Sequence, residues 1–148
     1  HIESYLEIQQ FRYQDILDYE IQMDEEIYGY IIPKLTLQPL VENALYHGIK
    51  NKRGKGKILI TGKKQGDKII FQVIDNGKGM TEEELNSLRK KMAGTDTGDE
   101  AKGFGVSNVN QRIKYYYGEE YGVFFESKEN EGTNATIIIA AKNIQLPS

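Results

Sequence analysis

The chain has 148 residues with three prolines, fifteen glycines and no cysteine, a size that fits one domain with a single core. Its 28% charged and 39% hydrophobic residues are typical of a folded, water-soluble domain, and the net charge of -3 gives no broad basic surface for nucleic acid. The lack of cysteine excludes a disulfide framework and cysteine-ligated zinc. No segment approaches the roughly 20 apolar residues of a membrane-spanning helix, so we expect no membrane contact by this domain.

The first part of the chain changes from a helical to a strand pattern. Residues 2–11 carry apolar side chains on one helical face and predict a short amphipathic helix. Residues 16–23 alternate apolar and polar side chains, which predicts a half-buried strand after a turn near residues 13–15. A connector without a clear pattern then leads to Pro33.

A second helix is predicted to begin at Thr36 and to end near Gly48, a typical C-cap residue. Pro39 is tolerated near its start, because the N–H groups of a first helical turn lack intrahelical partners. Asn43 and His47 lie one turn apart on one side of this helix. Its apolar stripe consists of Leu37, Leu40, Val41, Ala44 and Leu45.

A hairpin is predicted in the middle of the chain, after a basic, glycine-broken loop at residues 50–57. Residues 58–63 and 68–74 are rich in β-branched side chains, which predicts two strands. The Gln-Gly-Asp sequence at residues 65–67 is a turn signal, so the two strands are expected to pair antiparallel.

Two further helices and a second hairpin complete the predicted elements. Thr81 and Glu84 form a capping box that opens one helix. Residues 106–117 predict the next helix, and residues 121–127 and 133–141 predict two antiparallel strands. The side chains expected to face inward on the later helix are Val106, Val109, Ile113 and Tyr116 or Tyr117. Together the elements predict an α+β fold, a two-layer sandwich with helices on one face of a mostly antiparallel mixed sheet.

The sequence Asp-Asn-Gly-Lys-Gly-Met at residues 75–80 directly follows a predicted strand. A carboxylate at a strand end, next to glycines that allow close backbone approach, suits an acceptor for an exocyclic amine such as that of adenine. The competing interpretation is a plain glycine turn between a strand and a helix.

The sequence Gly-Phe-Gly-Val-Ser-Asn at residues 103–108 stands at a predicted helix start. It follows residues 94–102, which have no periodicity and predict a mobile loop that orders when a triphosphate binds. Exposed N–H groups and the helix dipole favour a phosphate ligand there. The pattern departs from a dinucleotide fingerprint and from a P-loop, and a loop hinge before a helix is the alternative interpretation.

Residues 42–48 place polar and ionisable groups on an otherwise apolar helix. Glu42 and Asn43 offer oxygen ligands that suit Mg²⁺ together with phosphate oxygens and water. A solvated helix face would explain Glu42, but it explains Asn43 poorly, since asparagine is a weak helix former. For His47, the alternative to a ligand role is a histidine satisfied at a helix C-terminus.

The order of these three motifs, followed by Gly132-Thr133 before the last strand, resembles the ATP-binding catalytic domain of sensor histidine kinases. Residues 37–48 look like the N box of the LytS/YesM-like type in particular, residues 75–80 its first glycine box and residues 103–108 its second. The resemblance covers residues 35–140 and implies the Bergerat ATP-binding fold, shared with DNA gyrase, MutL and heat-shock chaperone ATPases.

The resemblance implies roles for these residues. Asn43 would coordinate Mg²⁺ between the phosphates of ATP, Asp75 would accept a hydrogen bond from the adenine amine, and Thr133 would lie near adenine through water. The two glycines after Asp75 would form the wall of the adenine pocket, and residues 103–105 would close over the phosphates. The other residues implied in nucleotide binding are His47, Gly77, Gly79, Met80, Lys102, Gly103, Phe104, Gly105, Val106 and Asn108.

Two positions depart from related ATPases. Tyr46 stands where other histidine kinases often carry a lysine, so Lys50, Arg53 or Lys102 would have to contact the phosphates. Pro39 stands where gyrase-like ATPases and anti-sigma serine kinases carry a glutamate base. Glu42, the remaining candidate base, points about 100° away around the helix. The absence of a water-activating base favours a kinase over a hydrolase, because a neutral histidine nucleophile already offers a lone pair.

The resemblance implies a two-component system. Residues 1–15 would be the end of an upstream dimerisation and phosphoacceptor region, residues 16–141 the catalytic domain and residues 142–148 a tail. The acceptor histidine is expected on a helix upstream of residue 1, in the same or a partner subunit, and a response regulator receiver domain would accept the phosphoryl group next. The protein is expected to be a homodimeric, membrane-anchored sensor with this domain in the cytoplasm. The alternatives are a stand-alone ATPase or serine kinase of this fold, or a non-catalytic nucleotide-binding interaction module.

Overall fold

The computed structural model describes residues 17–29, 37–45, 56–92 and 104–142. The elements in chain order are β1 (Leu17–Met23), the 3₁₀ helix η1 (Glu25–Gly29), α2 (Gln38–Asn43), β2 (Gly56–Gln65), β3 (Lys68–Asp75), α3 (Glu82–Met92), α4 (Phe104–Tyr117), β4 (Gly122–Lys128) and β5 (Gly132–Ala140). The expectations for residues 2–11, 13–15, 50–55 and 94–102, and the C-cap at Gly48, lie outside the described residues.

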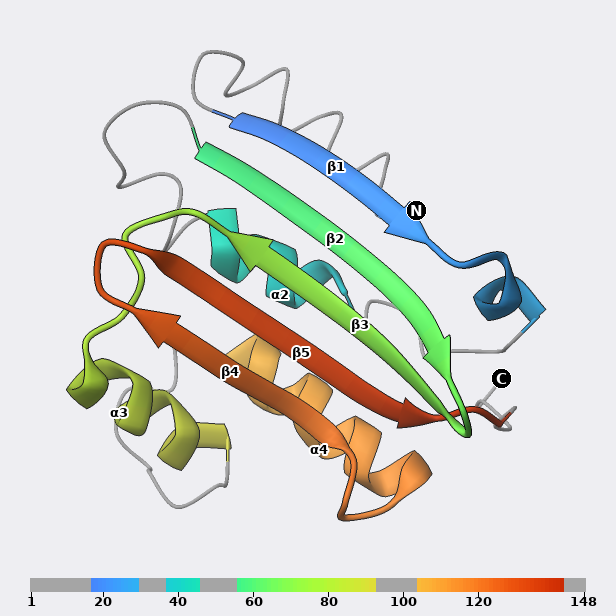
Figure 1. Ribbon diagram of the computed structural model, residues 1–148. Coiled ribbons are helices and arrows are strands. Elements are labelled where there is room, and N and C mark those ends of the chain that lie inside the picture. Colours follow the sequence, from blue (N-terminus) through green and yellow to red (C-terminus); the bar gives the residue numbers. More distant parts are fainter. Residues whose placement is uncertain (1–16, 30–36, 46–55, 93–103, 143–148) are drawn as a thin grey trace.

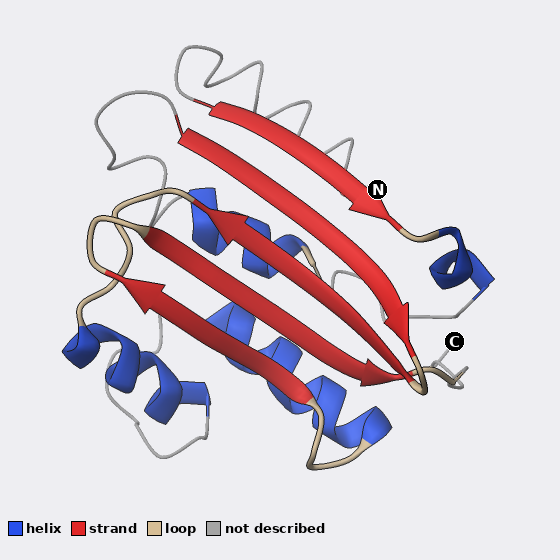
Figure 2. Ribbon diagram, viewed as in Figure 1, coloured by secondary structure: helices blue, strands red, loops and turns tan. Residues whose placement is uncertain are grey.

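The strands form one mixed sheet in the order β1-β2-β3-β5-β4. β1 runs parallel to β2, and every other neighbouring pair is antiparallel. Both predicted hairpins are present, and the first turns at Gly66 and Asp67, where Gly66 has a φ of +63°. α2 and α4 cover one face of the sheet, whereas α3 lies beside the edge strand β4 (Figure 1; Figure 2). The predicted two-layer α+β architecture is confirmed.

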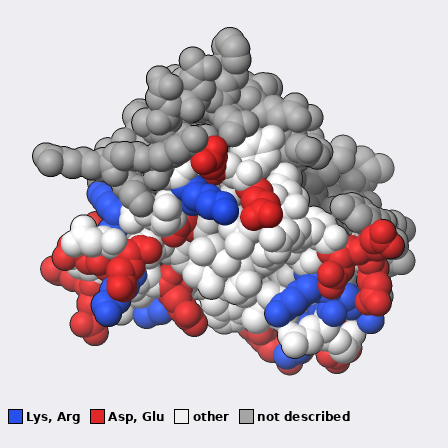
Figure 3. All heavy atoms as spheres, turned by 45° about the horizontal axis from the view of Figure 1, so that its top comes forward, with Lys and Arg blue, Asp and Glu red and all other residues white. Residues whose placement is uncertain are grey.

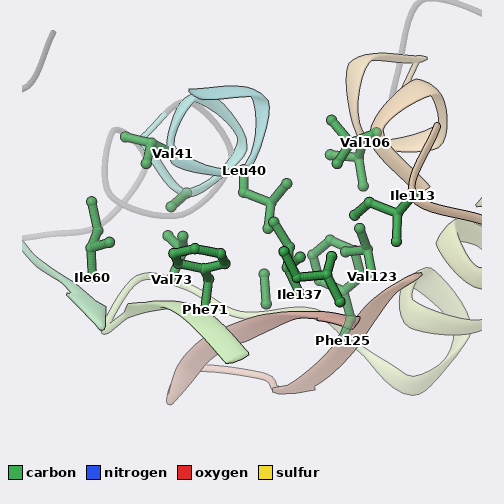
Figure 4. Packing of buried hydrophobic residues seen from close by; sticks show 14 of the residues in the cluster. Leu40, Val41, Ile60, Phe71, Val73, Val106, Ile113, Val123, Phe125 and Ile137 are labelled. Atoms are coloured by element: carbon green, nitrogen blue, oxygen red, sulfur yellow. The ribbon is translucent and has the colours of Figure 1, made fainter. Parts of the chain in front are cut away.

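The hydrophobic core lies between the sheet and the two helices that cover it. In Figure 4, Leu40 and Val41 of α2 face side chains of β2 and β3, and Val106 and Ile113 of α4 face side chains of β4 and β5. The facing sheet residues labelled there are Ile60, Phe71, Val73, Val123, Phe125 and Ile137, all buried. Because the buried side chains of a strand alternate along it, this packing also sets which residues face the core at each strand end.

Local sequence signals account for the start of α3 and the inner face of α4. The Thr81 hydroxyl accepts the Glu84 N–H at 3.1 Å, and the Glu84 carboxylate accepts the Thr81 N–H at 3.1 Å, which confirms the capping box. On α4 the predicted inward residues Val106, Val109 and Ile113 are buried, and Tyr117 is the buried member of its tyrosine pair.

Several elements differ from the sequence prediction. β2 begins at Gly56, so residues 56 and 57 belong to the strand and not to the predicted loop, and α4 begins at Phe104, two residues earlier than predicted. The connector after β1 contains η1, in which the Ile27 N–H donates to the Asp24 carbonyl at 3.2 Å and the Ile27 side chain enters the core. α2 begins at Gln38, two residues later than predicted, and Leu37 before it has helical dihedral angles but no side-chain cap. The burial of Ile27 is a tertiary contact, and a periodic sequence pattern does not indicate such a contact.

The described surface mixes charges of both signs. On the face that Figure 3 shows, acidic and basic side chains of the described residues lie close together, with uncharged side chains between them. Lys57 and Glu20 form an ion pair of 3.8 Å across β1 and β2. No helix among the described residues is long and apolar enough to cross a membrane.

Candidate functional site

The candidate site is built around a buried carboxylate at the end of β3. Asp75 is only 5% exposed, and its Oδ1 accepts the N–H of Gly77 at 2.8 Å. In the sheet register Asp75 lies opposite Thr133, near the start of β5. Because burial of an unsatisfied carboxylate is costly, the hydrogen bond from Gly77 both stabilises Asp75 and fixes its orientation. Asp75 and Thr133, which are far apart in sequence, are thus neighbours at one end of the sheet.

The loop that follows Asp75 is tied to two neighbouring segments. Asn76 exchanges two hydrogen bonds with Lys57 at the start of β2, of 2.7 Å from the Lys57 N–H to Oδ1 and 3.3 Å from the Asn76 N–H to the Lys57 carbonyl. The Asn130 N–H donates to the Lys78 carbonyl at 2.6 Å. These bonds link the loop to β2 on one side and to the β4–β5 turn on the other. The loop is therefore held in place by the folded chain itself.

Two glycines allow backbone segments to approach at this point. Gly79 has a φ of +67°, and a Cβ there would collide with the carbonyl oxygen of Lys128. Gly132 has a φ of +110°, and a Cβ there would collide with the carbonyl oxygen of Asp75. Side chains are strained at such φ values, so both the conformation and the lack of space require glycine. The close approach brings the start of β5 directly against Asp75.

Ser127 connects the parts of the site, and the sequence reasoning missed it. Its Oγ accepts the Met80 N–H at 2.8 Å, donates to the Gly132 carbonyl at 3.0 Å and lies 2.8 Å from the Thr133 hydroxyl. A hydroxyl has one proton, so Thr133 donates in that last contact. The Thr133 oxygen can then only accept from a further partner. A signal was present in the alternation of β4, because Val123 and Phe125 face the core and Ser127 follows them with the same period.

Glu42 and Asn43 lie at the end of α2, half-buried, beside the buried Leu40 and Val41. The Glu42 carboxylate accepts a hydrogen bond from the Gln38 side-chain amide at 3.1 Å, one turn earlier. α2 contacts α4 on the core face of the sheet. The N-box candidates and the Asp75 cluster therefore belong to facing layers of the sandwich.

The start of α4 faces the same end of the sheet as Asp75. α4 begins at Phe104 and ends at Tyr117, shortly before β4 begins at Gly122, and it lies along β4. Its first turn therefore lies toward the end of the sheet where β4 and β3 finish, as Figure 1 shows. The first N–H groups of a helix have no intrahelical acceptors and favour anions. Val106 is buried and Asn108 exposed in the first two turns.

The structure thus brings together some of the residues that the sequence predicts to bind the nucleotide. Asp75, Gly77, Gly79, Met80 and Thr133 form a connected cluster, with Asn43 on α2 and the first turn of α4, including Gly105, in the facing layer. His47, Lys102 and Gly103 lie outside the described residues. Within the described part of the chain, no group of three or more histidine, aspartate or glutamate side chains is arranged to hold a metal ion.

Comparison with solved structures shows the same fold in histidine kinase catalytic domains. The catalytic domain of histidine kinase ThkA has a TM-score of 0.64 at 22% identity, covering 95% of this chain and 89% of that one. The mycobacterial sensor histidine kinase MprB has a TM-score of 0.63 at 16% identity, covering 94% and 91%. The mixed five-strand sheet and its helices are therefore those of the Bergerat fold.

Sequence comparison finds sensor kinases among the relatives. The chain is 34% identical over 142 residues to "Sensor histidine kinase YesM" of Bacillus subtilis, covering 96% of this chain and 23% of that protein. It is 30% identical over 144 residues to "Sensor protein LytS" of Staphylococcus saprophyticus, covering 97% and 24%. The chain spans less than half the length of the curated relatives it matches.

The match to a family covers residues 33–143, from the segment before α2 to the residues just after β5. This range includes Asn43, Asp75, the first turn of α4 and Thr133, so it contains every described part of the site. An ATPase domain of this kind implies ATP binding. The chain belongs to the family of histidine kinase-, DNA gyrase B-, and HSP90-like ATPases.

Proposed function

We propose that this chain is the ATP-binding catalytic domain of a sensor histidine kinase, which transfers the γ-phosphoryl group of ATP to a histidine on an upstream helix. The observation that carries the proposal is the buried Asp75 carboxylate at the end of β3, oriented by Gly77 and placed opposite Thr133. The relatives named as sensor histidine kinases support the choice of reaction within the family.

In this proposal the Asp75 cluster recognises adenine. The carboxylate accepts a hydrogen bond from the adenine amine, and a carboxylate has capacity for such a bond beside the one from Gly77. The Thr133 hydroxyl donates its hydrogen bond to Ser127, so its oxygen accepts a hydrogen bond from a water molecule that in turn contacts the adenine ring. A guanine base carries a carbonyl oxygen at the corresponding position, which a carboxylate repels. The cluster therefore selects adenine over guanine.

The first turn of α4 and Asn43 serve the triphosphate. The N–H groups at the start of α4 bind phosphate oxygens, with Gly103, Phe104 and Gly105 closing over them and Lys102 or His47 adding contacts. Asn43 supplies a side-chain oxygen to Mg²⁺, whose remaining ligands are phosphate oxygens and water. When bound, Mg²⁺ neutralises phosphate charge as the γ-phosphoryl group leaves.

The role of Asn43 can be tested by its substitution. Asn43→Ala is expected to leave Mg²⁺-free ADP binding nearly unchanged and to reduce the gain in ATP affinity that Mg²⁺ provides by about ten- to a hundredfold, since even loss of a group that only supports a metal ligand costs that much. Titration calorimetry with and without Mg²⁺ measures this gain. Asn86→Ala, the same substitution at an exposed position of α3, is the control and should retain it. If Mg²⁺ raised the ATP affinity of Asn43→Ala as much as that of the wild type, Asn43 would not be a ligand of the metal.

The surroundings of Glu42 favour a kinase over an ATP hydrolase. Water attack on ATP needs a base placed at the phosphates, but Pro39 occupies the position one turn before Asn43, and the Glu42 carboxylate is held toward Gln38, one turn earlier on the helix. Phosphoryl transfer to a neutral imidazole needs no such base, so positioning and charge neutralisation are sufficient.

Activity of the chain with and without an acceptor tests the proposed reaction. Residues 1–148 alone should bind ATP but neither label themselves nor hydrolyse ATP above a trace rate. A longer chain that includes the upstream helix should form acid-labile, alkali-stable phosphate when supplied with ATP, as phosphohistidine does. Steady ATP hydrolysis by residues 1–148 that is lost in Glu42→Ala would move the chain to the ATPase branch of the family.

The wider setting follows from the proposed reaction. Residues 16–141 are the catalytic domain, residues 1–15 the end of the dimerisation and phosphoacceptor region, and residues 142–148 a tail. The acceptor helix belongs to the same subunit or to its partner in a homodimer, and a response regulator receiver domain takes the phosphoryl group from it. The domain lies in the cytoplasm beneath a membrane-anchored sensor, a setting supported by the relatives named as sensor proteins.

A further inference from the structure

A buried amide lies in the middle of α4, on its apolar side. Asn110 is 5% exposed and stands four residues after the buried Val106 and three before the buried Ile113. Asparagine is a poor helix former, and a polar side chain on the core face is costly unless it is hydrogen-bonded. The position of this side chain therefore depends on specific partners.

Asn110 bonds to two other elements at once. Its Nδ2 donates to the carbonyl of Met92, the last residue of α3, at 3.3 Å, and its Oδ1 accepts the N–H of Val123 in β4 at 2.9 Å. The orientation of the amide is unambiguous, because the Met92 carbonyl can only accept and the Val123 N–H can only donate. A Cβ at Gly122 would lie 2.5 Å from Oδ1, so the start of β4 fits closely around this amide.

Two further hydrogen bonds join the same three elements. The Ser107 hydroxyl of α4 donates to the Lys91 carbonyl at 3.4 Å, and Arg89 Nη2 of α3 donates to the Phe125 carbonyl of β4 at 2.8 Å. The last carbonyl groups of a helix lack intrahelical partners, and here side chains of α4 satisfy two of those of α3. Among these bonds, only Asn110 connects all three elements.

Each of the three elements leads to a different part of the site. α3 continues from the loop that carries Gly77 and Gly79, β4 carries Ser127 near its end, and the first turn of α4 begins six residues before Asn110. A shift of α4 relative to the other two would move its first N–H groups away from Asp75 and leave the Asp75 cluster intact. Asn110 resists this shift through its bonds to both α3 and β4, whereas the Ser107 bond joins α4 to α3 alone.

We infer that Asn110 is a positioning residue for the triphosphate: by fixing α4 to α3 and β4, it sets the distance between the phosphate-binding first turn of α4 and the adenine-binding Asp75. The inference rests on the proposed function, because it assigns the two ends of the nucleotide to those two places. It also predicts a specific signature. Disturbing Asn110 weakens binding of the phosphates and spares binding of the nucleoside.

Asn110→Asp tests this signature with little change in shape. The variant keeps an oxygen for the Val123 N–H but turns a second oxygen toward the Met92 carbonyl, so the bond to α3 becomes a repulsion. We expect ATP affinity to fall by about tenfold and adenosine affinity by less than twofold, within the range by which residues away from a ligand modulate binding. Both affinities are measured by calorimetry at a temperature well below the melting transition of each variant.

The control separates positioning from loss of stability. Ile113→Val, on the same helix and fully buried, removes one methyl group and lowers stability without touching these bonds. It should leave the ratio of ATP to adenosine affinity within twofold of the wild type. If Asn110→Asp does not fold, Asn110→Ser, which shortens the side chain and removes both bonds, takes its place with the same expected signature.

The outcomes distinguish this inference from the proposed function. A wild-type chain that binds no ATP, or binds ATP and GTP equally, overturns the proposed function and this inference with it. A wild-type chain that prefers ATP, with an Asn110 variant whose ATP and adenosine affinities change by the same factor or not at all, overturns the positioning role alone.

Discussion

Asp75→Asn is expected to weaken ATP binding by about 10- to 150-fold, which corresponds to the 1.5–3 kcal/mol of a hydrogen bond to a charged group. An amide has one oxygen where the carboxylate has two. In the variant, either the Gly77 N–H or the adenine amine therefore faces an NH₂ group that cannot accept its proton. The shape of the side chain is unchanged, so the loss measures hydrogen bonding and charge.

Titration calorimetry of ATP into the wild type and into Asp75→Asn measures this effect. Asp67→Asn is the matched control, because it removes the same charge at the exposed hairpin turn between β2 and β3, at the opposite end of β3. ATP affinity in Asp67→Asn should stay within twofold of the wild type. Equal losses in the two variants would mean that Asp75 acts only through net charge, and no loss in either would remove it from the site.

Gly132→Ala is expected to lower the free energy of unfolding by about 2–5 kcal/mol, the sum of roughly 1–2 kcal/mol for a side chain at positive φ and about 1–3 kcal/mol for the overlap. The overlap arises because the new Cβ would collide with the Asp75 carbonyl oxygen at a φ of +110°. Relief of that collision must move β5 away from β3 at the point where Asp75 and Thr133 pair. The variant is therefore expected to lose ATP affinity as well as stability.

Gly66→Ala provides the comparison for this substitution. Gly66 has a φ of +63°, also positive, but a Cβ there has no atom within 4 Å. Its substitution should cost only the backbone strain, about 1–2 kcal/mol, and leave ATP affinity unchanged. Urea denaturation of the two variants gives both free energies. Similar losses in Gly132→Ala and Gly66→Ala would show that the contact with Asp75 has no energetic weight.

Local patterns in the sequence were sufficient to predict most of the architecture. The Thr81–Glu84 capping box, the apolar stripe of α4 and the strand alternations each depend on residues a few positions apart, and all appear in the structure. η1 was missed, although its Ile27 side chain enters the core. Its burial is a tertiary contact with no local period.

The site was only partly predictable, for the same physical reason. The motif at residues 75–80 identified Asp75, but its pairing with Thr133 is a matter of strand register, which packing of the whole sheet decides. Ser127 and Asn110 did leave a signal, since each is a polar residue in a position where the period of its element calls for an apolar one. Their hydrogen-bond partners are mainly backbone groups of other elements, and a sequence pattern does not predict which backbone groups these are.

The comparison of ATP with GTP in the wild-type chain tests the central claim most directly, that a buried carboxylate at the end of β3 makes this an adenine-nucleotide site. Calorimetric titration of residues 1–148 with each nucleotide, in the presence of Mg²⁺, gives the two affinities. The account predicts ATP binding that is at least about tenfold tighter than GTP binding, because guanine offers Asp75 an acceptor in place of a donor. Equal affinities for ATP and GTP would contradict it.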